Sequence, residues 1–284
     1  NDIQRFITSV EKIYSTFSVE PRIQNHRKCK EKESYRGEVE FCNVSYQTDG
    51  EEILKDISFH VKPGQTVGIL GPTGVGKSTL MNLLCRFYDV SGGAVLIDGE
   101  DVRRLNLQNL RDHIGMAMQD VFLFSDTIEG NIAYGRPDCP FETVQKAAVM
   151  ADADNFIREI PDGYDTIVGE RGVGLSGGQK QRISLARALV KDPAILILDD
   201  TTSAVDMETE TYIQQQLKAL GENHTVFIIA YRISSIKDAD QILVLENGTI
   251  SERGTHDELL KNGGYYAQVF EHQYGKEAMT DGQK

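Results

Sequence analysis

The chain has 284 residues, 40% of them hydrophobic and 26% charged, which is ordinary for one large globular domain with appendages and excludes collagen-like and largely disordered classes. Its 43 acidic and 30 basic residues give a net charge of −13 without a basic stripe, so nucleic acid is not expected as a partner. The longest apolar runs, 194–198 and 226–231, are far shorter than the roughly 18 residues of a membrane span, and no span is predicted.

An amphipathic helix is predicted near the N-terminal end. Apolar residues recur there at spacings of three and four from Ile3 to Phe17, and the pattern ends before Pro21. The following segment, 24–36, is polar and rich in charge, which is typical of a linker that forms no core. We therefore place a domain boundary near Arg36.

Short β-rich runs follow this boundary. The runs 38–46 and 53–61 flank a turn at Asp49-Gly50 and predict an antiparallel layer. Residues 66–70 then form a compact apolar strand, which leads into a glycine-rich loop and a helix that begins near Lys77. A strand followed directly by a helix indicates the start of an α/β unit.

The second half of the chain alternates helices with buried strands. Helical periodicity covers 141–160 and 176–190, so the stretch 120–190 is expected to be mostly helical. The continuous apolar runs 194–198 and 225–230 are typical of strands that are buried on both faces of a parallel sheet. This alternation predicts an α/β core.

The C-terminal part is expected to contain a β-hairpin and a tail. Asn247-Gly248 lies between the strand-like runs 241–245 and 249–252, which is a strong signal for a tight hairpin turn. The last dozen residues, 273–284, have the composition of a disordered tail.

A phosphate-binding loop is predicted at residues 71–79. Their sequence, GPTGVGKST, matches the pattern G-x-x-x-x-G-K-[ST] between a strand and a helix. The glycines let backbone N–H groups converge on phosphate oxygens, and the helix N-terminus adds a favourable dipole. Lys77 is expected to reach the β- and γ-phosphates. The nucleotide contacts expected here are Gly71, Thr73, Gly74, Val75, Gly76, Lys77, Ser78 and Thr79.

Three residues are candidate ligands of Mg²⁺. The Ser78 hydroxyl follows the lysine of the loop, and Asp199 ends a buried strand where P-loop NTPases carry a magnesium-holding Asp. Gln119 follows a short apolar strand, 115–118, and from there it is expected to reach the metal and the attacking water. A Gln at a strand end can also be a simple cap.

Residues 175–179, LSGGQ, open a helix that continues KQRISLARAL, and here the sequence resembles the ATP-binding-cassette (ABC) family. In that family this signature binds the γ-phosphate of an ATP that is held by the opposite subunit of a dimer. A helix N-terminus with two glycines is also an anion site on physical grounds. The resemblance implies ATP and Mg²⁺ as cofactors and adds four nucleotide contacts, Ser176, Gly177, Gly178 and Gln179.

The resemblance covers residues 37–272. It implies an α/β fold with a P-loop NTPase core, a mostly parallel sheet, an antiparallel β subdomain and a helical subdomain at 120–190. Residues 1–36 are then an amphipathic helix and linker from a membrane domain, and 273–284 are the tail. The implied activity is ATP hydrolysis coupled to transport.

Other segments narrow the class to exporters. Residues 126–132 and 168–172 are similar to stretches of exporter-type cassettes, the second of which contacts the membrane domain in that family. The helix at 3–17 resembles the cytoplasmic extension of the last membrane helix, with an ordinary packing helix as the alternative. Because no initiator Met is present, we interpret the chain as the cytoplasmic part of a longer exporter. Its expected partners are the membrane-spanning domain and a second ABC subunit.

The residue after Asp199 departs from the family pattern. That position normally carries Glu, which polarises the attacking water, but here it is Asp200. The Asp side chain is one methylene shorter, whereas a general base must lie within roughly 2.6–3.2 Å of its proton. General-base catalysis contributes about 10²–10⁴-fold, so slow hydrolysis is expected at this site.

A second departure is Tyr231, which stands where the family has a switch His that contacts the γ-phosphate. A phenol donates one hydrogen bond but is bulkier than an imidazole and lacks its second nitrogen, so it cannot simply replace it. His224 precedes the strand and is expected to be a surface residue. The expected catalytic residues are Asp200, Gln119, Tyr231 and Lys77.

The contact to adenine is also altered. Thr48 occupies the position at which the family usually has an adenine-stacking Tyr. Tyr46 lies two residues earlier, on the same face of the strand, and is the expected substitute. Packing of Tyr46 in the core is the alternative.

Two departures at the hydrolytic end, beside an intact phosphate loop and signature, indicate a division of labour. We hypothesise that the chain pairs with a non-identical subunit and that its own site turns over slowly, while its signature completes the partner's site. Residues 203–206 resemble the family's D-loop at the dimer interface. The alternatives are a homodimer with two slow sites, a soluble ABC ATPase that serves DNA repair or translation, and a regulatory module without hydrolysis.

Overall fold

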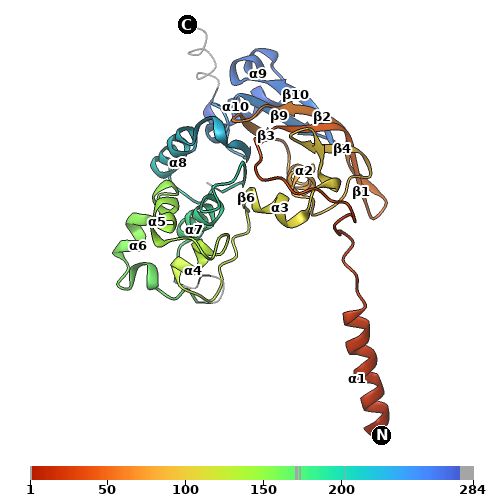
Figure 1. The fold of residues 1–284 in the computed structure, drawn as a ribbon. Helices are drawn as coiled ribbons and strands as arrows, with labels where there is room; N and C mark the ends of the chain where they lie inside the picture. Colours follow the sequence, from red (N-terminus) through yellow and green to blue (C-terminus); the bar gives the residue numbers. More distant parts are fainter. Residues whose placement is uncertain (1, 170–171, 173, 202, 276–284) are drawn as a thin grey trace.

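Two β-sheets and a group of helices organise the chain (Figure 1). A computed structural model describes residues 2–169, 172, 174–201 and 203–275. A six-stranded sheet, a four-stranded sheet and a helical part are present in this range, which confirms the α/β fold with a mostly parallel sheet, an antiparallel layer and a helical part.

The larger sheet has the strand order β10-β9-β3-β8-β7-β6. All neighbours from β9 to β6 are parallel, and only β10 is antiparallel, through the hairpin predicted at Asn247-Gly248. Because the inner strands are covered on both faces, they are apolar except at their end residues. The strands are β3 (Thr66–Leu70), β6 (Ile114–Ala117), β7 (Ile195–Asp199), β8 (Thr225–Ile229), β9 (Gln241–Glu246) and β10 (Thr249–Gly254).

The smaller sheet is antiparallel, with the order β2-β1-β4-β5. Asp49 and Gly50 both have positive φ angles, 49° and 82°, which produces the tight turn predicted between the first two strands. Phe41 and Phe59 stack across this pair at 4.5 Å. The strands are β1 (Val39–Thr48), β2 (Glu51–Val61), β4 (Gly92–Ile97) and β5 (Glu100–Asp101).

Two helices lie in the sequence between β3 and β6, which are the first two strands of the larger sheet along the chain. Helix α2 (Lys77–Leu84) buries one apolar face, including Leu80 and Met81, in the core shared by both sheets. Helix α3 (Leu107–Asp112) begins at Asn106, whose side chain accepts hydrogen bonds from two backbone N–H groups of the first turn. These contacts fix the helix that begins at the predicted phosphate loop.

The helical part has its own apolar core. The periodic stretch 141–160 forms two helices rather than one, because Asp152 adopts a left-handed conformation with φ of 55° and ends the first helix. The prediction of one continuous helix over 141–160 was therefore wrong. The helices are α4 (Ile128–Ala133), α5 (Phe141–Met150), α6 (Asp154–Glu159) and α7 (Gly177–Leu189).

The helix at 207–219 packs on the core of the helical part, whereas the last two helices pack on the β9 side of the larger sheet. The fully buried Tyr266 anchors α10 there, where its hydroxyl hydrogen-bonds His256 at 2.7 Å. Residues 273 and 274 of the predicted tail belong to α10, and 276–284 lie outside the described residues. The helices are α8 (Met207–Ala219), α9 (His256–Asn262) and α10 (Tyr265–Tyr274), with short 3₁₀ turns at Val102–Arg104, Gly163–Asp165, Gly221–Asn223 and Ile233–Ser235.

Helix α1 (Asp2–Phe17) projects away from the rest of the chain and buries no residue (Figure 1). No helix in the described part of the chain is long and apolar enough to cross a membrane. The segment 24–36, which was predicted to be a linker that forms no core, differs from this prediction at its C-terminal end. Tyr35 is buried, and its hydroxyl donates a 2.9 Å hydrogen bond to Asn109 of α3.

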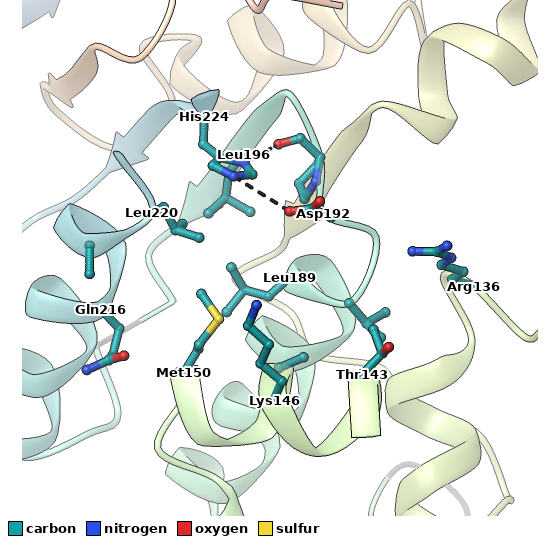
Figure 2. Close-up of a pocket in the computed structure, with 14 residues that line it drawn as sticks. Arg136, Thr143, Lys146, Met150, Leu189, Asp192, Leu196, Gln216, Leu220 and His224 are labelled. Carbon is teal, nitrogen blue, oxygen red and sulfur yellow. Dashed lines mark hydrogen bonds and ion pairs between the residues drawn. The ribbon is translucent and has the colours of Figure 1, made fainter. Parts of the chain in front are cut away.

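His224 is also not the surface residue that was expected. Its side chain is only 12% exposed and lies beside a cavity between α5, α8 and the start of β7 (Figure 2). Nδ1 donates a 2.8 Å hydrogen bond to the Pro193 carbonyl oxygen, and Nε2 lies 3.6 Å from a carboxylate oxygen of Asp192. His224 is largely buried because the turn before β8 packs back on the sheet. The local sequence pattern does not show this packing, so the burial of His224 was not predicted.

Candidate functional site

The candidate site lies at one edge of the larger sheet. Strands β3, β8, β7 and β6 are parallel neighbours, so their carboxyl ends meet at this edge. The phosphate loop follows β3, Tyr231 follows β8, Asp199 ends β7 and Gln119 follows β6. The parallel order therefore brings together residues that lie far apart in the sequence.

Glycine is required in the phosphate loop at both ends. A Cβ at Gly71, where φ is 153°, would lie 2.3 Å from the carbonyl oxygen of Leu245. A Cβ at Gly76, where φ is 103°, would lie 2.8 Å from a methyl group of Leu54. At Gly74, with φ of 81°, a Cβ would meet nothing within 4 Å. The ends of the loop are thus packed against the protein, while its middle faces open space as a phosphate cradle requires.

Lys77 is buried, with 5% of its surface exposed. Its ammonium group donates hydrogen bonds to the carbonyl oxygens of Gly71 at 2.8 Å and Pro72 at 2.9 Å. It also lies 4.7 Å from the centre of the Tyr231 ring. Burial lowers the pKa of Lys77, and the nearby carboxylates of Asp199 and Asp200 oppose that shift. The loop carbonyls and the aromatic ring therefore hold this cation in the position from which a phosphate would attract it.

Ser78 and Asp199 form a pair of oxygen donors. The Ser78 hydroxyl donates a 2.7 Å hydrogen bond to Asp199, which is 7% exposed. Burial raises the pKa of Asp199, and the Ser78 hydrogen bond and Lys77 oppose the shift. Among the described residues, no group of three or more His, Cys, Asp or Glu side chains is arranged so that it could hold a metal ion. This set fits Mg²⁺, which is usually held by one or two carboxylates together with water and substrate phosphates.

Asp200 and Gln119 follow the ends of two neighbouring parallel strands, β7 and β6. Asp200 has φ of 49°, and its N–H donates to the Ile229 carbonyl oxygen at 2.9 Å, which ties the turn after β7 to β8. Burial is the largest cause of a raised pKa at Asp200, and the charge of Asp199 adds to it. Gln119 is exposed, two residues beyond the end of β6. Both side chains thus belong to the edge at which the phosphate loop opens.

The signature forms the exposed N-terminus of α7. The Ser176 hydroxyl accepts a hydrogen bond from the Gln179 N–H at 3.2 Å, and the Gln179 side chain accepts one from the Ser176 N–H at 2.9 Å. This capping box leaves Ser176 and Gly177 exposed. A Cβ at Gly178 would lie 2.9 Å from the carbonyl oxygen of Ala204, so glycine lets the expected D-loop pack on the helix start.

The two candidates for adenine contact differ in burial. Tyr46 is half-buried, lies against the core, and has its ring 5.6 Å from that of Tyr88. Thr48 is exposed at the end of β1, opposite Glu51. An aromatic pair offers a flat apolar surface, whereas a threonine does not. Glu170 and Arg171, which the sequence associates with contact to the membrane domain, lie outside the described residues.

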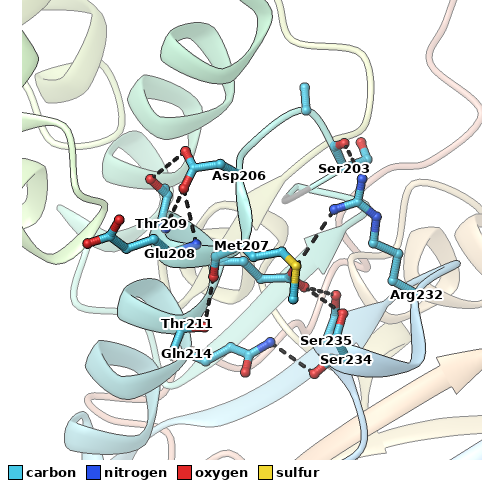
Figure 3. A network of polar contacts seen from close by, with 12 residues as sticks. Ser203, Asp206, Met207, Glu208, Thr209, Thr211, Gln214, Arg232, Ser234 and Ser235 are labelled. Carbon is cyan, nitrogen blue, oxygen red and sulfur yellow. Dashed lines mark hydrogen bonds and ion pairs between the residues drawn. The ribbon is translucent and has the colours of Figure 1, made fainter. Parts of the chain in front are cut away.

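A polar network missed by the sequence interpretation joins these parts (Figure 3). Arg232 donates a 3.1 Å hydrogen bond to the Ser203 carbonyl oxygen and lies 3.8 Å from the buried Glu210. Gln181, one turn into α7, donates to Ser203 at 3.2 Å and accepts from the Ala204 N–H at 3.1 Å. The residue after Tyr231 and the signature helix are therefore both tied to the expected D-loop.

A second branch of the network reaches the helical part. Asp206 caps α8 by accepting a 2.9 Å hydrogen bond from the Thr209 N–H (Figure 3). The Thr209 hydroxyl lies 3.2 Å from Asp152, which forms a 2.9 Å ion pair with Arg182 of α7. The only sequence signal for Gln181 was its position four residues after Gly177, on the same helix face.

Comparisons with known proteins agree with this geometry. Residues 54–203, more than half of the chain, match the family model described as ABC transporter. The chain is 51% identical to the uncharacterized ABC transporter ATP-binding protein YknU of Bacillus subtilis, covering 94% of this chain and 46% of that protein. It is 44% identical to ATP-binding cassette sub-family B member 6 of Xenopus tropicalis, covering 98% of this chain and 33% of that protein.

A solved structure shows the same fold. The structure of a bacterial Atm1-family ABC exporter with ATP bound superposes with a TM-score of 0.92 and 41% identity, over 96% of this chain and 48% of that chain. The present chain thus spans half or less of the length of the relatives it matches. The chain belongs to the ABC transporter family and is one of its ATPase domains.

Proposed function

We propose that this chain is the motor part of an exporter, in which ATP binding and hydrolysis at the cytoplasmic face of the membrane drive export through a membrane-spanning domain of the same protein. The observation that carries the proposal is the buried Lys77 beside the Ser78–Asp199 pair, under a loop whose middle is open. The matched relatives support the exporter class, because the ABC exporter with ATP bound covers almost the whole chain.

The described residues suit the following roles. Backbone N–H groups of the phosphate loop bind the phosphates, and Lys77 exchanges its carbonyl partners for phosphate oxygens. Ser78, Asp199 and Gln119 would hold Mg²⁺, which would supply charge neutralisation at the phosphates. Asp200 accepts the proton of the attacking water, and Tyr46, with its neighbour Tyr88, provides the surface on which adenine stacks.

The site is attenuated at its hydrolytic end. Asp200 is shorter than the Glu that its position usually carries, and the turn after β7 is fixed by its backbone bond to Ile229, so the backbone does not advance to compensate. Tyr231 packs its ring over Lys77 instead of presenting an imidazole nitrogen. ATP is accordingly held firmly and cleaved slowly at this site.

The signature acts on the nucleotide of a second, non-identical ABC subunit. Its helix N-terminus is exposed, and within the described ranges no hydrogen bond joins residues 176–179 to the phosphate loop. An anion from a partner can therefore reach its free N–H groups. A homodimer with two slow sites is the second candidate, because both copies would then carry Asp200 and Tyr231.

MgATP binding and ATP-dependent transport by the full-length protein in lipid vesicles test the proposal. Lys77→Ala should weaken MgATP binding by this chain about 100-fold and abolish ATP-dependent accumulation of a transported dye inside inverted vesicles. Lys62→Ala, which alters an exposed lysine outside the loop, is the matched control. Unchanged nucleotide binding by the Lys77 variant would overturn the assignment of the site. MgATP binding by the unaltered protein without any ATP-dependent transport would overturn the exporter role.

A further inference from the structure

A cavity of about 540 Å³ lies between the helical part and the larger sheet, away from the candidate nucleotide site (Figure 2). Its walls come from α5, the C-terminal end of α7, the start of β7 and the last turn of α8. The phosphate loop and Asp199 lie at the carboxyl ends of the strands, whereas the cavity lies near the amino ends of β7 and β8. The two sites therefore do not share lining residues.

The floor of this cavity is apolar. Leu189 is 8% exposed and Leu196 is fully buried, and both contribute to the lining together with Met150 and Leu220. Met150 ends α5, Leu189 ends α7, Leu196 belongs to β7 and Leu220 directly follows α8, so these side chains approach the cavity from different elements (Figure 2). A volume of this size is within the roughly 300–1,000 Å³ of small-molecule sites, and an apolar floor is their usual composition.

The rim is positively charged, in contrast to a chain whose net charge is −13. Arg136 and Lys146 are among the lining residues. Among the described residues, no side chain forms a hydrogen bond or an ion pair with the side chain of Arg136 or Lys146. Asp192 is the one carboxylate in the lining, and it already faces His224 at 3.6 Å. The rim thus offers two unpaired cations above an apolar floor.

We propose that this cavity is a binding site for an amphipathic organic anion, with a carboxylate near Lys146 and Arg136 and an apolar body on the leucine floor. A carboxylate accepts a charge-assisted hydrogen bond from Lys146, Arg136 adds a second positive charge to the lining, and burial of the body adds a hydrophobic contribution. Because the walls belong to both α5 and α8, the bound anion stabilises the arrangement of the helical part on the sheet. The site is independent of the function proposed for the phosphate loop.

The neighbouring cavity provides an internal contrast. It measures about 300 Å³ and shares His224 with the first, but its lining contains the carboxylates of Asp238 and Asp240. Its one lysine, Lys218, is already paired with Asp238 at 3.1 Å. This second cavity repels an anion, so the sign of the ligand charge distinguishes the two.

Calorimetric titration of the chain with 1-naphthylacetate tests the proposal, with the neutral amide and the cationic 1-naphthylethylamine as isosteric probes. A dissociation constant of about 1 mM or lower is expected for the anion, from the affinity per atom that is usual for a ligand of this size. Lys146→Gln should weaken binding about tenfold, as expected for loss of one charge-assisted hydrogen bond. Lys261→Gln, on the exposed surface of α9, is the matched control and should change nothing.

Two further variants locate the bound anion. Ala219 is exposed and lines the cavity, so Ala219→Trp should block the anion without disturbing the core, as a thermal melt of the free variant would verify. Lys77→Ala should leave binding unchanged, because the phosphate loop is a separate anion site. Three results would each overturn the proposal. They are equal binding of 1-naphthylacetate and its neutral amide, no binding of 1-naphthylacetate, and loss of its binding in Lys77→Ala but not in Lys146→Gln.

Discussion

The phosphate loop and the hydrolytic edge beside it belong to one candidate site, yet packing constrains them differently. The loop allows no larger residue at Gly71 or Gly76, since a Cβ there would meet Leu245 or Leu54. Asp200 and Tyr231 are half-buried or partly exposed side chains at strand ends, where a shorter carboxylate and a phenol are accommodated. Binding of phosphate is thus fixed by the backbone, whereas the rate of hydrolysis depends on two replaceable side chains.

The largest effect is expected at the binding half. Lys77→Ala removes the cation that the carbonyl oxygens of Gly71 and Pro72 hold, and its charge-assisted contact with phosphate is lost with it. MgATP affinity of the chain should fall about 100-fold. Equilibrium titration with MgATP measures this, and a fall of less than threefold would show that the loop does not depend on Lys77.

The next effect separates the signature from the chain's own site. Gly178→Asp places a carboxylate at the N-terminus of α7, where a partner's phosphate is expected. ATP turnover of the assembled two-subunit transporter should fall about 30-fold, which corresponds to about 2 kcal/mol at a partly buried helix N-terminus. MgATP binding by the isolated chain should stay the same. Gln215→Asp, which adds the same charge on the exposed face of α8, is the control.

Lengthening the side chain at position 200 should increase the rate of hydrolysis instead of lowering it. Asp200→Glu together with Tyr231→His restores the residue types that this family usually carries, so single-turnover hydrolysis at this site should rise about tenfold. MgATP affinity should change by less than threefold, because the phosphate loop is untouched. An unchanged rate would contradict the view that these two positions limit hydrolysis.

The smallest effect concerns stability. Burial raises the pKa of Asp199 above its unfolded value, so the folded state binds the proton more tightly and ionisation at neutral pH costs stability. Asp199→Asn should therefore raise the free energy of unfolding by about 1 kcal/mol at pH 7. This gain should shrink as pH falls through the folded-state pKa, because the wild-type carboxyl is then neutral too. Urea titrations between pH 7 and pH 4 measure it, and a gain that grows on acidification would contradict the assignment.

Much of the fold could be predicted from sequence because its signals are local. The apolar run Thr66–Leu70 became β3 with the predicted bounds, and Asn247-Gly248 became the predicted hairpin turn. The single helix expected at 141–160 was wrong because one residue, Asp152, takes a left-handed conformation within an otherwise helical pattern. A single backbone angle is not encoded in hydrophobic periodicity.

The candidate site was predictable only where one motif holds several residues together. The phosphate loop and the signature are each a continuous run of residues. The parallel order of the strands explains why Asp199 and Tyr231 lie beside the phosphate loop. The contacts of Arg232 with Ser203 and of Gln181 with Ala204 connect segments far apart in the chain, and no local pattern announces them. The burial of Tyr35 and His224 was missed for the same reason.

The central claim is that the site formed by Asp200 and Tyr231 contributes little to ATP turnover. Steady-state hydrolysis by the assembled two-subunit transporter, measured with Asp200→Ala and separately with the equivalent carboxylate of the partner removed, tests it most directly. We expect Asp200→Ala to leave more than about half of the turnover, because the slow site adds little, while loss of the partner's carboxylate lowers it by about 10²-fold or more. Equal losses from the two substitutions would contradict the account.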